Sequence, residues 1–400
     1  MTEKRKSPAL RFRGYTDDWE QRKLGEILQE RNTRTSDFES NPLYSLTIES
    51  GVTPKTDRYE RSSLVTKTED LFKIVKPNEF VTNPMNLRFG ALGYNRNAFT
   101  VSVSGYYDVF SIDDDKCSGF WNSYFKTLTA MNIFDNAATG SLIEKRRVKY
   151  STLQQLAFYM PNDLSEKAEI GKYMDTFDNL ITLHQRKLEK LKLVKKSMLE
   201  KMFPKNGSSV PEIRFKGFTD DWEQRKLGDI FEEYSEKDHA ELPALTIIQG
   251  GGTIRRDESD RALQYDKKSL SNYKKVDVGD FIVHLRSFEG GLEMATNTGI
   301  VSPAYHIFHG EKVDSRFYYS YFRSKQFINT DLKPHVYGIR DGRSIDIEGM
   351  KTIEIPWTIL DEQKAIGNSI DTLDHLNTLH QRKVEKLKIL KKSMLEKMFV

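Results

Sequence analysis

Residues 11–25 read Arg-Phe-Arg-Gly-Tyr-Thr-Asp-Asp-Trp-Glu-Gln-Arg-Lys-Leu-Gly, and they recur at residues 214–228 with thirteen of fifteen positions identical. A second stretch, Leu-His-Gln-Arg-Lys-Leu-Glu-Lys-Leu-Lys-Leu-Val-Lys-Lys-Ser-Met-Leu-Glu-Lys-Met-Phe at residues 183–203, returns at residues 379–399 with eighteen of twenty-one identical. Similarity at a fixed offset indicates a repeated structural unit. The 400-residue chain is therefore a tandem duplication.

Between these borders the two interiors, residues 26–160 and 229–356, have diverged, but their elements follow the same order. Each has a turn leading into a strand, a second strand, an aromatic helix, and a Gly-containing loop before an apolar strand that ends at a proline. Such patterns predict a mixed α+β domain in each unit. The corresponding segments are 72–81 and 273–282, 104–110 and 302–308, 120–125 and 317–322, and the strands ending at Pro161 and Pro356.

A long helix with a heptad pattern follows each interior. Ser165 and Asp361 are the predicted N-caps, with Glu166 and Glu362 in the first turn. A second apolar stripe through residues such as Leu180 and Leu379 gives each helix more than one face to bury. The apolar heptad positions are Ile170, Met174, Phe177, Ile181, Leu188, Leu191, Met198 and Met202, and then Ile366, Ile370, Leu373, Val384, Leu387, Met394 and Met398.

These features predict an α+β fold with two domains in a pseudo-twofold tandem repeat, separated by two long antiparallel coiled-coil helices. Antiparallel packing puts both basic helical segments on one assembly. The predicted divisions are a border segment at 1–25, a domain at 26–161, a central helix at 162–203, a linker and repeated border at 204–228, a domain at 229–356, and a C-terminal helix at 357–400.

Composition narrows the class of protein. Charged residues make up 30% of the chain, and no apolar run approaches the ~20 residues of a membrane-spanning helix. The basic N-terminus is not followed by an apolar signal region, and the single cysteine, Cys117, suits a reducing cytoplasm. Each repeated helix segment holds seven Lys or Arg against two Glu, a local positive charge that suits an anionic partner such as DNA.

With these repeated borders and with helices that carry Leu-Glu-Lys-Leu-Lys at 188–192 and Val-Glu-Lys-Leu-Lys at 384–388, the chain resembles the specificity subunit of a Type I restriction-modification system over almost its whole length. The resemblance implies that each interior is a target-recognition domain that reads one half of a bipartite sequence in double-stranded DNA. It implies two methyltransferase subunits as partners, to which two restriction subunits can be added. S-adenosylmethionine, ATP and Mg²⁺ are then expected on those partners, with no cofactor or metal bound by this chain.

Motifs of adenine methyltransferases and ATPases are missing from the sequence. Asn83-Pro84-Met85 lacks the second proline and the aromatic residue of a base-flipping methyltransferase motif. No Gly-x-x-x-x-Gly-Lys-Ser/Thr loop is present, and Glu362-Gln363-Lys364 is better explained as the first turn of a helix than as a nuclease motif. We therefore expect a non-catalytic protein. The alternative is a coiled-coil DNA-binding or interaction scaffold outside restriction-modification.

Base readout requires polar side chains on elements that reach a groove of the duplex. Two corresponding loops meet this requirement, and a second pair of segments supplies candidates for phosphate contacts and some base contacts. His184 and His380 are better explained as a polar layer in the helix seam than as metal ligands, and Trp19 and Trp222 as anchors to a helix end. The predicted DNA-binding residues are Asn86, Arg88, Tyr94, Asn95, Arg96, Arg146 and Arg147 in the first domain, and His284, Arg286, Ser287, Tyr337, Arg340 and Arg343 in the second.

Overall fold

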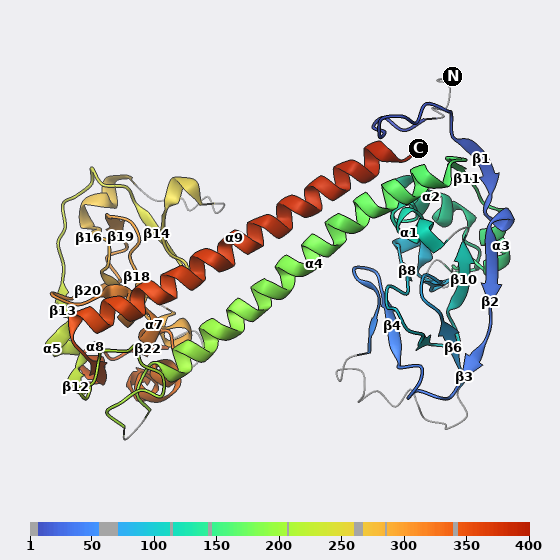
Figure 1. Cartoon of the computed structure of the whole chain (residues 1–400). Helices are drawn as coiled ribbons and strands as arrows, with labels where there is room; N and C mark the ends of the chain where they lie inside the picture. Colours follow the sequence, from blue (N-terminus) through green and yellow to red (C-terminus); the bar gives the residue numbers. More distant parts are fainter. Residues whose placement is uncertain are drawn as a thin grey trace. The chain divides into compact units, whose positions relative to one another are not determined.

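The computed structural model divides the chain into two units, shown in Figure 1. The first unit contains residues 1–185 and 382–400, and the second contains residues 186–381. No helix in the described part of the chain is long and apolar enough to cross a membrane. The structure describes residues 7–55, 71–112, 115–142, 146–205, 208–259, 267–284, 286–338 and 343–400.

The first unit is built on small antiparallel sheets. Its strands are β1 (Glu20–Lys23), β2 (Leu28–Arg31), β3 (Arg34–Thr35), β4 (Tyr44–Thr47), β5 (Gly51–Pro54), β6 (Phe72–Val75), β7 (Phe80–Thr82), β8 (Leu92–Tyr94), β9 (Val101–Val103), β10 (Asp108–Ile112) and β11 (Ala157–Met160). Its helices are η1 (Leu24–Glu26), η2 (Leu87–Phe89), η3 (Asp115–Cys117), α1 (Ser118–Tyr124), α2 (Leu128–Ala137), α3 (Tyr150–Gln155) and the first part of α4 (Leu164–Lys201). The four-stranded sheet has the order β2-β10-β7-β8.

The second unit repeats this plan. Its strands are β12 (Glu223–Lys226), β13 (Glu232–Tyr234), β14 (Leu245–Ile248), β15 (Gly252–Arg255), β16 (Lys274–Val276), β17 (Phe281–Val283), β18 (Glu293–Met294), β19 (Gly299–Val301), β20 (His306–His309), β21 (Val336–Tyr337), β22 (Ser344–Ile345) and β23 (Glu354–Trp357). Its helices are α5 (Leu227–Ile230), η5 (Arg256–Glu258), η6 (Lys267–Asn272), α6 (Ser287–Gly290), α7 (Ser315–Phe322), η7 (Phe327–Asp331), η8 (Lys333–His335), α8 (Ile347–Lys351) and most of α9 (Leu360–Met398).

The predicted α+β repeat is confirmed by matching sheet orders. The order β13-β20-β17-β18 in the second unit reproduces β2-β10-β7-β8 in the first. The border strands also correspond, because β1 pairs with β11 and β12 pairs with β23, both antiparallel. One detail differs from the prediction: β23 continues through Pro356 to Trp357, because Pro356 lies opposite Gln224 in a two-stranded ladder that needs few backbone donors.

The repeated border is fastened to the first turn of each long helix. Arg11 donates from Nε and Nη2 to the Glu166 carboxylate at 2.6 and 2.8 Å, and Trp19 Nε1 lies 3.4 Å from Glu166 Oε1. In the second copy, Arg214 donates to Glu362 at 2.7 and 2.9 Å, and Trp222 donates at 3.0 Å. A buried carboxylate requires such charged and hydrogen-bonding partners. The prediction that the tryptophans anchor the border to a helix end is confirmed.

Both helices begin slightly earlier than predicted. Helix α4 starts at Leu164, and its cap is Asp163, whose Oδ1 accepts the backbone N–H of Ser165 at 2.7 Å. Helix α9 starts at Leu360, which places Asp361 inside the first turn. The predicted N-caps Ser165 and Asp361 are therefore wrong, because both residues already lie inside the first turn of their helix.

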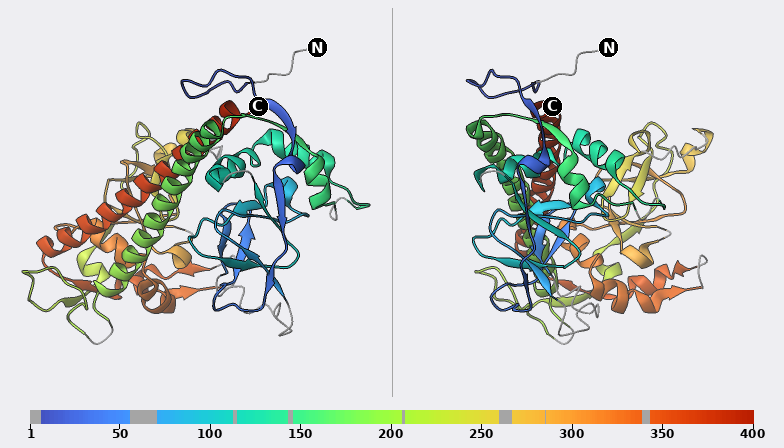
Figure 2. Two further views of the ribbon diagram at one scale, coloured as in Figure 1. Left: turned by 45° about the vertical axis from the view of Figure 1, so that its right-hand side comes forward. Right: turned by 90° about the vertical axis from the view of Figure 1, so that its right-hand side faces the viewer.

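The long helices α4 and α9 pack together and run antiparallel within each unit (Figure 1). In the first unit Lys391 of α9 forms an ion pair with Asp178 of α4. In the second unit Lys195 of α4 lies 2.6 Å from Asp374 of α9. Two further views also show α4 and α9 side by side (Figure 2). The heptad residues Ile170, Met174, Ile366 and Ile370 are buried, as the apolar pattern predicts.

The C-terminal end of α9 packs into the core of the first unit, and the N-terminal border lies beside it. Leu10 N–H donates to the Lys397 carbonyl at 2.9 Å, and the Phe399 ring packs 4.9 Å from that of Tyr124. In the second unit Phe203, at the end of α4, packs 5.1 Å from Phe317 of α7. Each unit is therefore closed by the aromatic residue that follows or ends a repeated helix.

Candidate nucleic-acid interface

The two candidate segments of the second unit lie against each other. Arg343, at the base of the β21–β22 hairpin, places its guanidinium 4.6 Å from the centre of the Phe288 ring on α6. The same guanidinium is 3.7 Å from the Glu289 carboxylate. A cavity of about 70 Å³ between the segments is lined by His284, Phe288, Arg343 and Ser344, among others. The fold thus brings together residues separated by more than fifty positions in the sequence.

Backbone hydrogen bonds fix the turn that carries His284. The backbone N–H of Arg286 donates to His284 Nδ1 at 3.2 Å, and the backbone N–H of His284 donates to Ser287 Oγ at 2.9 Å. Because Nδ1 accepts, the ring proton of a neutral His284 lies on Nε2. That atom is buried without a partner in the described part of the chain. Ser287 is fully buried, so its hydroxyl shapes the turn, while Arg286 is exposed.

We expect His284 to remain neutral well below the pH at which histidine usually titrates. Burial, followed by the charges of Arg323 and Arg286, lowers the pKa of His284 to about 4. A folded-state pKa below the unfolded value stabilises the fold above about pH 6.5 and loses that contribution as pH falls toward 4. NMR titration of the imidazole, assigned by comparison with His284→Gln, measures this. A midpoint near 6.5 would contradict the buried turn.

In the first unit, two predicted arginines converge on helix α2. Arg88 Nη1 lies 3.1 Å from Asp135 Oδ1, and Arg146 Nη1 lies 3.7 Å from the same atom. Arg146 also donates to the backbone carbonyls of Asp135 at 2.6 Å and Ala138 at 3.1 Å, and so caps the C-terminus of α2. The Arg88 side chain is only 11% exposed. Arg88 thus holds the loop after β7 against α2, and Arg146 holds the segment before α3 against the same helix.

Three further predicted residues are held by polar groups of the first unit itself. Asn95 is fully buried, and its amide donates to the carbonyls of Val75 and Phe99 at 3.0 and 2.9 Å. The Tyr94 hydroxyl donates to Asp175 of α4 at 3.0 Å, and burial raises the pKa of Tyr94. Arg96 donates to the carboxylates of Asp175 and Asp178 at 2.8 and 3.0 Å. The contacts of Tyr94 and Arg96 attach the end of β8 to helix α4.

Six of the predicted residues are exposed, and Arg340 lies outside the described residues. The sequence reasoning missed Tyr106, which is 91% exposed in the turn between β9 and β10. Because Asp108 pairs with Thr82, that turn lies beside the loop after β7. The available signal in the sequence was a tyrosine that directly follows Gly105 and stands just before a strand. The exposed predicted residues are Asn86, Arg96, Arg147, Arg286, Tyr337 and Arg343.

The candidate segments occupy equivalent places in the two units. Helix η2 connects β7 to β8, and α6 connects β17 to β18. The second segments, Thr139–Arg147 and the β21–β22 hairpin, each follow the aromatic helix of their unit. Exposed arginine, asparagine and tyrosine side chains on such loops can bind phosphates and base edges. The described residues contain no group of three or more His, Cys, Asp or Glu that could hold a metal.

The match to a known protein family also falls into two parts, one for each repeat of the chain. The family model of the Type I restriction modification DNA specificity domain matches residues 16–193 and again residues 219–388. The chain is 27% identical over 282 residues to the putative type I restriction enzyme MjaX specificity subunit of Methanocaldococcus jannaschii, covering 63% of this chain and 62% of that protein. It is 26% identical over 251 residues to the MjaVIII specificity subunit of that organism, covering 58% and 59%.

The chain thus spans less than two thirds of the length of these curated relatives. The crystal structure of a Type-I restriction-modification system S subunit from M. genitalium aligns with a TM-score of 0.61 at 12% identity. That alignment covers 98% of this chain and 99% of the other. At this identity the likeness concerns the fold, and it agrees with the arrangement of elements described above.

Proposed function

Because the chain belongs to the family of Type I restriction-modification DNA specificity domains, we propose that it is a specificity subunit that reads a bipartite DNA target. Each recognition domain reads one half of the target. The chain supplies sequence recognition and performs no catalysis itself. Two methyltransferase subunits, bound to it in the cytoplasm, transfer a methyl group to adenine N6, and restriction subunits add cleavage when they join.

One observation carries this proposal: loops with different sequences occupy the same place in two copies of one scaffold. The scaffold residues Trp19 and Trp222 make the same contact in both units. The exposed residues differ, with Asn86 after β7 and Arg286 after β17. A repeat that keeps its frame and changes its loops suits two different half-sites. A coiled-coil scaffold without sequence-specific binding gives no reason for the loops to differ. The family match favours a specificity subunit over such a scaffold.

The partner proposal is supported by the second apolar stripe. Leu183 is 47% exposed in the first unit, and Leu379 is 38% exposed in the second. Apolar side chains exposed along a helix suit an interface with another subunit. S-adenosylmethionine, ATP and Mg²⁺ are assigned to the partner subunits.

The proposal is tested by producing the chain together with its methyltransferase subunit in a host without adenine methylation. Mapping N6-methyladenine should reveal one motif with two defined halves separated by unspecified bases. Arg286→Ala should relax one position of one half, at a cost of about 1–3 kcal/mol if Arg286 contacts guanine. Arg13→Ala, at an exposed border position, is the control and should leave the motif unchanged. Methylation without a defined motif would contradict the proposal.

A further inference from the structure

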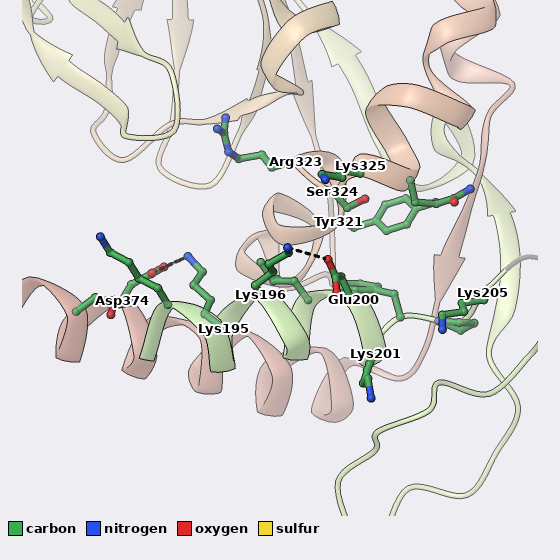
Figure 3. Close-up of a pocket in the computed structure, with 16 residues that line it drawn as sticks. Lys195, Lys196, Glu200, Lys201, Lys205, Tyr321, Arg323, Ser324, Lys325 and Asp374 are labelled. Atoms are coloured by element: carbon green, nitrogen blue, oxygen red, sulfur yellow. Dashed lines mark hydrogen bonds and ion pairs between the residues drawn. The ribbon is translucent and has the colours of Figure 1, made fainter. Parts of the chain in front are cut away.

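The second unit contains a large pocket between the basic end of α4 and the turn after α7 (Figure 3). Its volume is about 1010 Å³, and seven Lys or Arg side chains line it against two carboxylates. Lys192 and Lys196 come from α4, and Lys325 comes from the opposite wall. Asp374 and Asn377 of α9 complete the lining.

Several of the cations already have acidic partners. Lys195 is held by Asp374 at 2.6 Å, Arg323 forms an ion pair with the buried Glu293, and Lys205 forms one with Glu212. Lys196 lies 4.0 Å from Glu200, with both side chains more than half exposed. No ion pair is found for Lys192 or Lys325 among the residues that the structure describes. The pocket therefore keeps an excess of positive charge.

The floor of this pocket is apolar. Phe203 and Tyr321 are buried there, and Leu199 and Pro204 line the same surface. Asn377 contributes a buried Oδ1 atom that accepts no hydrogen bond within the described residues. A cationic rim over an apolar floor complements a segment that combines carboxylates with aliphatic or aromatic side chains.

We propose that this pocket binds an acidic, apolar-bearing segment of the methyltransferase subunit, an inference that rests on the function proposed above. Duplex DNA is a less suitable occupant, because it is far wider than the pocket and presents no apolar side chains to the floor. Carboxylates of the segment pair with Lys192, Lys196 and Lys325.

The repeat supplies a matched control. Lys388 and Lys392 of α9 occupy the positions equivalent to Lys192 and Lys196, within a nearly identical sequence. The facing wall differs, because Leu128 stands where the second unit has Lys325. Partial burial also lowers the pKa of Lys126, the counterpart of Arg323, to about 8. The same charge reversals can thus be made inside and outside the pocket.

The experiment measures binding of the methyltransferase subunit to the full chain by mass photometry. Lys192→Glu/Lys196→Glu and Lys325→Glu should each weaken binding about tenfold or more, because they place like charges against the acidic segment. Lys388→Glu/Lys392→Glu should change it less than about twofold. Equal losses in pocket and control variants would overturn the proposal, since they would indicate general attraction to basic helices.

A second readout identifies the occupant. A photocrosslinking residue in place of Lys325 should label a peptide of the methyltransferase subunit that is rich in Asp and Glu. Labelling of DNA, or of a basic peptide, would overturn the proposal. A wild-type complex that methylates no defined motif would contradict the proposed function. Pocket variants that assemble normally in a complex that does methylate its motif would contradict the pocket inference alone.

Discussion

Exchanging residues 27–156 for the corresponding segment of another specificity chain should replace one half of the methylated motif and leave the other half unchanged. The segment contains the candidate DNA-binding loops of the first domain. Its junctions leave strands β1 and β11 and the Trp19–Glu166 contact in place. The exchanged domain is therefore joined to the native border strands and helix. Methylome sequencing of the chimera measures the result.

The matched experiment exchanges residues 230–353 in the second unit. There β12, β23 and the Trp222–Glu362 contact remain in place. This chimera should change the other half-site and keep the first. If either exchange alters both halves of the motif, the two domains do not read DNA independently.

Glu362→Ala should lower the free energy of unfolding by about 3–5 kcal/mol, because it leaves the charge of a largely buried arginine without its partner. Glu362 is fully buried and accepts two hydrogen bonds from Arg214 and one from Trp222. Glu166→Ala removes the equivalent carboxylate in the first unit and should have a comparable effect. Urea unfolding followed by circular dichroism measures both losses.

Glu189→Ala is the control for these two variants, since Glu189 is exposed on α4. It should change the stability by less than about 0.5 kcal/mol. Glu362→Gln should fall between these results, because the amide can still accept a hydrogen bond from Trp222 but no longer pairs with the charge of Arg214. A loss below 1 kcal/mol for Glu362→Ala would show that the border is not fastened through this carboxylate.

The order and type of the helices and strands could be predicted because local sequence patterns, repeated in the two halves, specify them. The spacing of Ile170 and Met174 predicts one buried helix face, and both residues are buried. Residues 120–124 of the predicted aromatic helix lie in α1, and Phe125 is the first residue after that helix. Helix starts were less accurate, since Asp163 is as good a cap as Ser165 and local sequence does not choose between them.

The predicted DNA-binding residues stay predictions, but the structure separates them by exposure. A polar side chain in a loop can face solvent or satisfy buried backbone groups, and both choices look alike in sequence. Asn95 satisfies buried backbone groups, because its amide donates to the carbonyls of Val75 and Phe99. Arg286 instead faces solvent.

The sequence by itself determined the duplication, the α+β class and the long helices, and it marked the candidate DNA-binding loops. These follow from short-range periodicity and from the identity of the two borders. The tertiary structure alone decided that Arg88 and Arg146 share Asp135 and that Arg343 reaches Phe288. It also assembled the pocket of Lys192 and Lys325. Such contacts join residues far apart in the chain, and their partners depend on how packed elements meet, which no local pattern records.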